Sequence, residues 1–125
     1  MSIKFGDKIR EMRRRDKLTL RELSERSEIE LTYLSKLENN KTGVPEEKTI
    51  EKLVKALRVN TDEREELFRL TKQIPSDWKN DLTENTRIFG IFRSAKGLSD
   101  AQLEEIQKEI ERIKKSKNER DHKKC

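Results

Sequence analysis

Apolar residues recur at helical spacing between Thr19 and Glu38, and they predict two short helices joined by a tight turn. In the second helix, placed at residues 31–38, the inner side is formed by Tyr33, Leu34 and Leu37. The outer side is formed by Leu31, Thr32, Ser35, Lys36 and Asn39. The inner face is expected in the core, and the outer face remains free to read a partner.

The helix before this turn has an inward stripe of its own, formed by Leu20 and Leu23. Ile29 lies in the connection, where one apolar side chain fills the space between the two helices. Thr19 is a natural N-cap, and Glu22 three residues later completes a capping box. Together these features are typical of a helix-turn-helix.

Three further helices are predicted around this pair, and they complete a bundle of five by residue 74. The first covers about residues 3–15, and its buried side is formed by Ile3, Ile9 and Met12. The fourth covers about residues 45–57 and has Pro45 in its first turn, where proline is tolerated. The fifth covers about residues 61–73, where Pro75 prevents its continuation.

A second helical region is predicted at residues 75–116. Ser76 caps a short helix, another covers about residues 86–96, and Gly97 ends it in the left-handed conformation. A capping box from Ser99 to Gln102 starts a third helix, whose apolar seam is formed by Leu103, Ile106, Ile110 and Ile113. We therefore expect a helix-turn-helix domain at 1–74, a helical region at 75–116 and a charged disordered tail at 117–125.

This seam has two interpretations, because it is too short to form a coiled coil alone. In the first, it packs within the same chain on the aromatic residues that precede it. In the second, the same residues form an interface with another copy of the chain or with a different protein. The residues concerned are Trp78, Phe89, Phe92, Leu103, Ile106, Ile110 and Ile113. Both interpretations hold together if two copies exchange a helix.

Composition supports an all-α fold. Of 125 residues, 30% are hydrophobic and 44% are charged, which suits narrow apolar stripes on short helices and does not fill a sheet sandwich. The formal net charge of +5 is compatible with a polyanionic partner such as nucleic acid. The sequence contains neither a membrane-length apolar run nor a signal-peptide pattern, so we expect a cytoplasmic protein without membrane contact.

Candidate catalytic chemistry is missing from the sequence. The single histidine, His122, and the single cysteine, Cys125, both lie in the charged tail, so no histidine-based triad or metal site is expected. The four glycines are scattered and form no phosphate-binding loop. We expect neither an enzyme nor a cofactor.

Residues 4–60 resemble the Cro/C1-type helix-turn-helix domain of phage repressors and of the XRE family of bacterial regulators. The resemblance is carried, in order and without gaps, by the segments FGDKIREMR, LTLRELS, YLSKLENNKT and TIEKLVKALRVN. It implies a five-helix, lambda repressor-like bundle that usually works as a dimer on operator DNA.

The resemblance also implies roles for individual residues. The base-reading positions fall on the outer side of the recognition helix, at Leu31, Thr32, Ser35 and Lys36. The phosphate-contacting loop falls on Asn39, Asn40 and Lys41. Two more candidate phosphate contacts stand at the start of the second helix, Thr19 and Arg21. A buried ion pair between the first helix and the recognition helix falls on Arg13 and Glu38.

Four positions depart from the family pattern. Leu20 stands where a phosphate-contacting glutamine is common, and Ser27 replaces an aliphatic residue. Glu28 stands where glycine is favoured, and a left-handed glutamate costs about 1 kcal/mol, so the turn is expected to differ in detail. Glu30 occupies the usual Ser or Thr cap and would repel nearby phosphates.

These observations predict a sequence-specific DNA-binding transcriptional regulator, a dimeric repressor on double-stranded DNA. The alternative is a protein-interaction module, such as an antitoxin or a coactivator-like bridging protein, that holds a partner with its C-terminal helices. The segments IPSDW, ENTRIFGIFR and RSAKGLSDAQLEEI also resemble XRE regulators that are paired with a zinc metallopeptidase or a toxin. That resemblance implies such a protein as the partner of the C-terminal helices.

Overall fold

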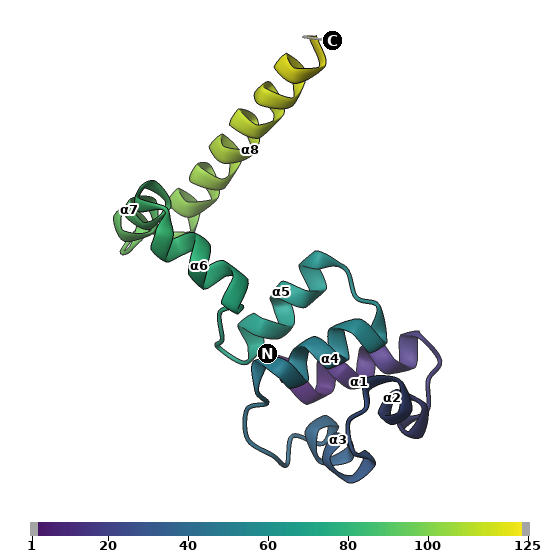
Figure 1. Cartoon of the computed structure of the whole chain (residues 1–125). Helices are drawn as coiled ribbons and strands as arrows, with labels where there is room; N and C mark the ends of the chain where they lie inside the picture. The colour runs from purple at the N-terminus through teal and green to yellow at the C-terminus, as the bar shows by residue number, and fades with distance from the viewer. Residues whose placement is uncertain (1–2, 124–125) are drawn as a thin grey trace. The chain divides into compact units, whose positions relative to one another are not determined.

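The computed structural model describes the backbone of residues 3–123 and the side chains of residues 3–116. All regular secondary structure in these residues is α-helical, which confirms the predicted fold class. The chain divides into two compact units, Met1–Lys79 and Asn80–Cys125. The first unit contains α1 (Phe5–Arg15), α2 (Leu20–Ser27), α3 (Leu31–Glu38), α4 (Glu47–Leu57), α5 (Thr61–Leu70) and the start of α6 (Ser76–Glu84) (Figure 1). The second unit contains the end of α6, α7 (Thr86–Ala95) and α8 (Asp100–Lys123).

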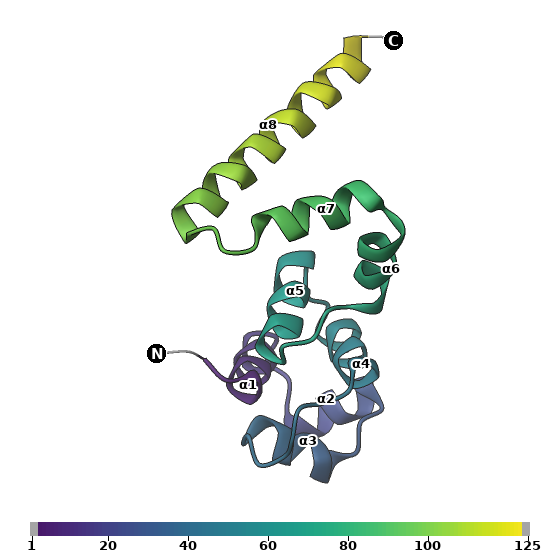
Figure 2. The same cartoon turned by 90° about the vertical axis from the view of Figure 1, so that its left-hand side faces the viewer.

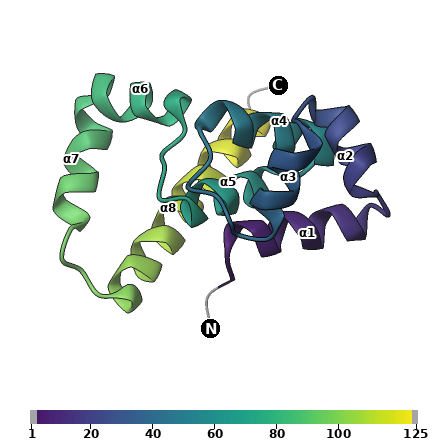
Figure 3. The same cartoon turned by 90° about the horizontal axis from the view of Figure 1, so that it is seen from below.

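One hydrophobic core holds the first unit together. α1 packs against α3 and α5, α2 packs against α3 and α4, and α4 packs against α5 (Figures 1 and 3). All five helices contribute buried side chains, which include Ile9, Met12, Leu23, Leu34, Leu37, Ile50, Leu53, Leu57, Leu67 and Phe68. Each helix supplies a narrow stripe, so a chain with few apolar residues is still able to close a core.

Two helices of the first unit, α2 and α5, begin at a capping box, whereas the N-cap residues of α1, α3 and α4 make no side-chain capping bond. The predicted capping box is present at α2, where Thr19 Oγ1 accepts a hydrogen bond from Glu22 N at 3.1 Å and Glu22 Oε1 accepts one from Thr19 N at 3.0 Å. Asn60 and Glu63 form a second box at α5. Such boxes satisfy backbone N–H groups that have no partner inside the helix.

Two helices begin later than predicted. α1 begins at Phe5, so Ile3 precedes the helix and is 38% exposed instead of buried. α4 begins at Glu47, and Pro45 lies before it. The carbonyl of Pro45 accepts a hydrogen bond from Gln73 Nε2 at 2.7 Å, which fixes this residue outside the helix.

Each of the first five helices ends at a left-handed residue that is not glycine: Lys17, Glu28, Asn40, Arg58 and Lys72. At the end of α5, the N–H of Gln73 bonds to the carbonyl of Phe68 at 3.0 Å, and the N–H of Lys72 bonds to that of Arg69 at 3.0 Å. This pair of bonds is a Schellman motif. It ends α5 at Leu70, three residues before the predicted end at Gln73.

The beginning of α6 is anchored on the first unit. Ser76 is the first helical residue, not the cap that the sequence predicts, and its N–H and hydroxyl donate to the Glu47 carboxylate at 2.9 and 2.6 Å. Arg64 of α5 binds Glu51 of α4 at 2.7 Å and Asp77 of α6 at 3.1 Å. Three helices therefore meet around these charged groups.

The second unit has well-formed helix starts. Asn85 Oδ1 accepts hydrogen bonds from two backbone N–H groups in the first turn of α7, at 3.0 and 3.1 Å. The predicted capping box joins Ser99 and Gln102 through bonds of 2.9 and 3.2 Å. Gly97 between the helices is left-handed, with φ of 87°, as the sequence predicts. Figure 2 shows α7 and α8 on either side of this turn.

Within the second unit, no described side chain is buried. Phe89 and Phe92 of α7 are 48% and 57% exposed, and Ile110 and Ile113 of α8 are 42% and 54% exposed. These four side chains thus keep about half of their surface exposed within this unit. Ile106 of the seam is half-buried and lines a depression together with Ile91 of α7.

α8 continues to Lys123, through most of the segment for which we expect disorder. Lysine, arginine and glutamate have high helix propensity, so an entirely polar stretch is able to extend a helix that has already started. Cys125 and the side chain of His122 lie outside the described residues. In the described part of the chain, no helix combines the length and the hydropathy needed to cross a membrane.

Candidate nucleic-acid interface

The outer side of α3 carries the predicted base-reading residues on a firmly held helix. On its inner side, Leu34 is 0% exposed and Leu37 is 3% exposed. On the outer side Thr32 and Lys36 are exposed, whereas Leu31 and Ser35 are half-buried. The division between the two faces is the one that helical spacing predicts.

These four side chains line one shallow depression, with a volume of about 630 Å³, together with Thr19, Leu20 and Arg21 at the start of α2. The structure thus brings the predicted base-reading residues together with two of the predicted phosphate contacts. Leu20, expected in the inner stripe of α2, is only half-buried and reaches this depression.

The turn between α2 and α3 accommodates both unusual residues. Glu28 adopts the left-handed conformation that glycine usually takes, with φ of 61° and ψ of 26°. Ser27 is 4% exposed, and its hydroxyl donates to the carbonyl of Leu23 at 2.7 Å and accepts from the N–H of Ile29 at 3.3 Å. The serine is buried with its hydrogen bonds satisfied, so it replaces an aliphatic residue without leaving a polar group unpaired.

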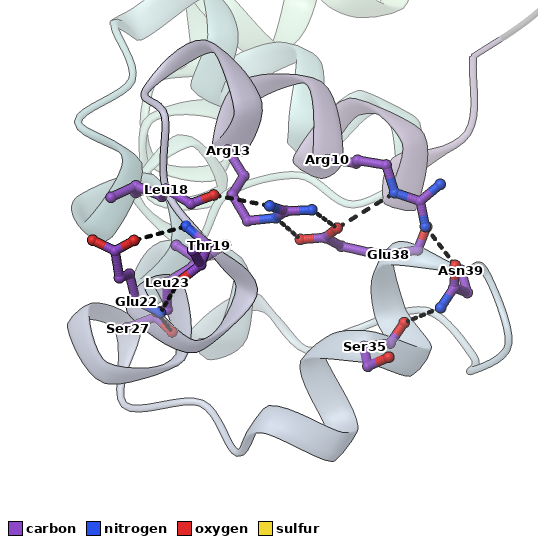
Figure 4. Close-up of polar contacts among 10 residues, drawn as sticks. All are labelled: Arg10, Arg13, Leu18, Thr19, Glu22, Leu23, Ser27, Ser35, Glu38 and Asn39. Carbon is purple, nitrogen blue, oxygen red and sulfur yellow. Dashed lines mark hydrogen bonds and ion pairs between the residues drawn. The ribbon is translucent and has the colours of Figure 1, made fainter.

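The structure brings Arg13 and Glu38 together in a bidentate ion pair that joins α1 to the end of α3 (Figure 4). Arg13 Nε lies 2.7 Å from Glu38 Oε2, and one terminal nitrogen lies 3.0 Å from Glu38 Oε1. Glu38 is only 2% exposed, and Arg13 also donates to the carbonyl of Leu18 at 2.8 Å. The hydrogen bond to Glu38 raises the pKa of Arg13, and the bidentate pair fixes α3 against α1.

Arg10 is a second cation at this carboxylate, and the sequence analysis did not identify it. Its Nε lies 3.5 Å from Glu38 Oε1, and a terminal nitrogen donates to the carbonyl of Glu38 at 3.4 Å and to Asn39 Oδ1 (Figure 4). Arg10 precedes Arg13 by three residues on α1, so both side chains lie on the same helix face. This spacing in the sequence could have indicated that Arg10 also lies beside Glu38.

Asn39 and Asn40 are predicted phosphate contacts, but both side chains are engaged inside the protein. Asn39 donates to the carbonyl of Ser35 at 2.9 Å and accepts from Arg10. Asn40 Oδ1 accepts from the N–H of Gly6 at 3.0 Å, and its Nδ2 donates to Asp7 at 3.1 Å. Both residues therefore connect the end of α3 to α1.

The other predicted phosphate contacts differ in how free their polar groups are to bind a phosphate. Thr19 is exposed, but its hydroxyl and its N–H both take part in the capping box. Arg21 and Lys41 are exposed, and neither belongs to an ion pair among the described residues. Glu30 is also exposed, and as N-cap of α3 its side chain makes no capping bond. The surface thus offers the free cations Arg21 and Lys41 together with two exposed acidic side chains, Glu28 and Glu30.

Metal coordination is not a feature of this surface. Among the residues that the structure describes, no three histidine, cysteine, aspartate or glutamate side chains are placed to hold a metal ion.

Comparison with known proteins identifies the family. The helix-turn-helix domain family matches residues 4–67, which is just over half of the chain. Two relatives from Bacillus subtilis (strain 168) align over 55 residues: an uncharacterized HTH-type transcriptional regulator, RghRB, at 46% identity, and the HTH-type transcriptional repressor RghR, at 40% identity. Each alignment covers 44% of this chain, and the chain spans only 40% and 41% of the length of these relatives. No solved structure shows a significant match. The matched region contains the helix-turn-helix and most of the buried core, and the chain belongs to the helix-turn-helix domain family.

Proposed function

We propose that this chain is a DNA-binding transcriptional regulator of the Cro/C1 (XRE) type, which represses as a dimer by placing α3 in the major groove of operator DNA. The observation that carries the proposal is the outer side of α3, where Thr32 and Lys36 are exposed on a helix whose inner side is buried. The similarity to a relative named as a repressor supports the same function.

Rigid placement of α3 suits direct reading of bases. The bidentate pair of Arg13 with Glu38 fixes the end of the helix, and the turn at Glu28 fixes its start. Lys36 is the candidate for the guanine O6 and N7 atoms, while Thr32 and Ser35 supply short hydrogen-bonding groups. Because the helix backbone is already fixed, binding costs little further backbone entropy, and the remaining cost is that of ordering the side chains.

Phosphate contacts are proposed for Arg21 and Lys41, which flank this face from α2 and from the loop after α3. The proposed role of Asn39 and Asn40 is limited to their backbone, because their side chains already hold α1. Lysine and arginine at phosphates add affinity that falls as the salt concentration rises.

The second unit is proposed to make the dimer. One recognition helix reads only a few base pairs, so useful affinity requires two half-sites about 34 Å apart. Phe89, Phe92, Ile110 and Ile113 are between 42% and 57% exposed, and Leu103 at the start of the same seam is 37% exposed. An apolar face of this kind marks an interaction site.

A second candidate function uses the same face for a different protein, such as a metallopeptidase or a toxin. Two features favour it: Glu28 and Glu30 are exposed beside α3, and the side chains of Asn39 and Asn40 are occupied. Each of these features removes or opposes a phosphate contact. Stoichiometric co-purification of a protein that still binds a Lys36→Ala variant would favour this candidate.

The decisive experiment is selection of bound sequences from a random duplex pool. The full chain is compared with a chain that ends at Lys79, which keeps the contacts between Ser76 and Glu47. A palindromic sequence for the full chain, reduced to a half-site or lost in the shorter chain, is the expected result. No enriched sequence from either chain would contradict the proposal.

Two substitutions separate reading from phosphate binding. Lys36→Ala is expected to cost about 1–3 kcal/mol at one base pair and to relax the preference there. Lys41→Ala is expected to lower the affinity for all DNA sequences equally and to reduce the dependence of affinity on salt concentration. Equal weakening of all sequences by Lys36→Ala would instead assign Lys36 to a phosphate.

A further inference from the structure

Leu20 and Leu31 occupy corresponding places in the two helices of the motif, because each is the first residue of its helix. Both are half-buried, and both line the same depression. Leu20 also packs against the core, and the capping box at Thr19 fixes the backbone that carries it. The two side chains form an apolar floor, here named the leucine notch.

The rest of the depression is polar. Its lining is completed by Thr19, Arg21, Thr32, Ser35 and Lys36. These side chains offer hydroxyl groups and cations to base edges and phosphates, whereas the leucine notch offers no hydrogen bond at all. A group that enters the notch is therefore recognised by its apolar surface.

We propose that the leucine notch selects a thymine in each half-site by burying the C5 methyl group, an inference that rests on the proposed DNA-reading role of α3. The thymine methyl is the apolar group that base pairs display in the major groove. A cytosine amino group or a purine N7 pressed against the notch would lose water without gaining a hydrogen bond. The notch therefore favours thymine and disfavours the other bases.

This inference gives Leu20 a new role. The family resemblance places a phosphate-contacting glutamine at this position, and leucine has no donor for a phosphate oxygen. The neighbouring Arg21 is exposed and retains that capacity. The departure at Leu20 thus changes a phosphate contact into a determinant of sequence specificity.

The test uses the full chain and the duplex that selection enriches. Each thymine of a half-site is replaced in turn by deoxyuridine, which removes the methyl group and keeps the base pair. At one thymine, the affinity of the wild-type protein is expected to fall about fourfold, as for the loss of one buried methyl-sized group. The affinity is expected to change least at thymines whose methyl groups face away from the protein.

Variants then assign the effect to Leu20. In Leu20→Ala, the ratio of affinities for the thymine and deoxyuridine duplexes is expected to fall below about twofold. Because this ratio compares two duplexes with one protein preparation, any loss of folded protein cancels. Leu20→Met keeps a similar apolar volume and is expected to keep the ratio. Val44→Ala is the matched control, since Val44 is 68% exposed and is not part of the depression.

Two results would overturn the inference in distinguishable ways. If wild type and Leu20→Ala show equal ratios at every thymine, Leu20 has no role in selection and the inference fails, while the proposed function stands. If selection enriches no sequence, the proposed function fails and the inference fails with it.

Discussion

The first unit buries the inner side of each of its first five helices, whereas the second unit buries none of its described side chains. This difference does not come from poorer helix signals. α5 of the first unit begins at an Asn60–Glu63 capping box, and α8 of the second unit begins at a Ser99–Gln102 box of similar geometry. The comparison teaches that capping starts a helix, while only packing of an apolar face against other elements makes a stable domain.

The large apolar residues of the second unit stay partly exposed. Phe92 is 57% exposed, while Phe68 in the first unit is 1% exposed. Because full burial of an exposed phenylalanine or isoleucine contributes about 1.5–3 kcal/mol, covering a half-exposed one on association contributes about half as much. The stability of the first unit is therefore intrinsic, and that of the second unit is expected to depend on a partner. Three matched pairs of substitutions test this contrast.

The largest difference in the free energy of unfolding is expected between the substitutions Gly6→Ala and Gly90→Ala. A Cβ atom at Gly6 would lie 2.2 Å from the carbonyl oxygen of Leu37 and 2.8 Å from that of Glu38, whereas a Cβ at Gly90 meets nothing within 4 Å. Because backbone atoms cannot move aside, Gly6→Ala is expected to destabilise the first unit by about 3 kcal/mol. Gly90→Ala lies within α7 and is expected to stabilise that helix by about 0.5–1 kcal/mol.

Urea unfolding of the full chain measures both effects. Trp78 fluorescence reports on the first unit, and far-ultraviolet circular dichroism reports on all helices. An unchanged Trp78 transition in Gly6→Ala would show that α1 does not approach α3 this closely.

The next largest difference in the free energy of unfolding is expected between substitutions of two arginines, one in each unit. Arg13→Met leaves the buried Glu38 carboxylate with only its longer contact to Arg10, at 3.5 Å, and is expected to cost about 2–3 kcal/mol because a buried carboxylate that loses its bidentate partner is costly. Arg112 of α8 pairs with Glu109, but these side chains are 66% and 54% exposed. Arg112→Met is expected to change the free energy of unfolding much less than Arg13→Met does, because solvent screens an exposed ion pair.

Urea unfolding, followed by the same two signals, measures the effects of these two arginine substitutions. The double substitution of Arg13→Met with Glu38→Leu is expected to recover most of the loss, since it removes the buried charge together with its partner. Failure of the double variant to recover would indicate that Arg13 acts through its bond to Leu18 instead.

Much of the secondary structure was predictable because the signals for it lie in residues close together in the sequence. The bounds of α3 follow from the spacing of Tyr33, Leu34 and Leu37, and the starts of α2 and α8 follow from capping residues. The ends of α1, α3 and α4 also lie where the sequence predicts them, whereas α5 ends three residues earlier than predicted. The left-handed residues that follow these helices were harder to predict. Lys17, Asn40, Arg58 and Lys72 adopt the left-handed conformation without being glycine, and the tertiary packing around them compensates for that local cost.

The candidate site also has features that the sequence predicts and features that it does not. Periodicity alone separates the exposed Thr32 and Lys36 from the buried Leu34, so the exposed face of α3 could be predicted. The engagement of Asn40 with Gly6, and of Arg10 with Asn39, joins residues about thirty positions apart. Such contacts depend on how α1 crosses α3, and the spacing of apolar residues along one helix does not contain that information.

The smallest difference is expected between two left-handed residues, Glu28 in the first unit and Gly97 in the second. Glutamate in this conformation costs about 1–2 kcal/mol, and glycine adds entropy to the unfolded chain, so Glu28→Gly is expected to stabilise the first unit by about 0.5–1 kcal/mol. Gly97→Ala introduces the opposite strain between α7 and α8 and is expected to leave the Trp78 transition unchanged.

Glu28→Gly also tests function, because it removes an exposed negative charge beside the proposed DNA-reading face. Affinity for the selected duplex is expected to rise, and the gain is expected to shrink at high salt as the charges are screened. Glu28→Gln separates the two effects, since it removes the charge and keeps the left-handed strain. If Glu28→Gln binds DNA no better than wild type while Glu28→Gly does, the geometry of the turn limits binding, and the glutamate charge does not.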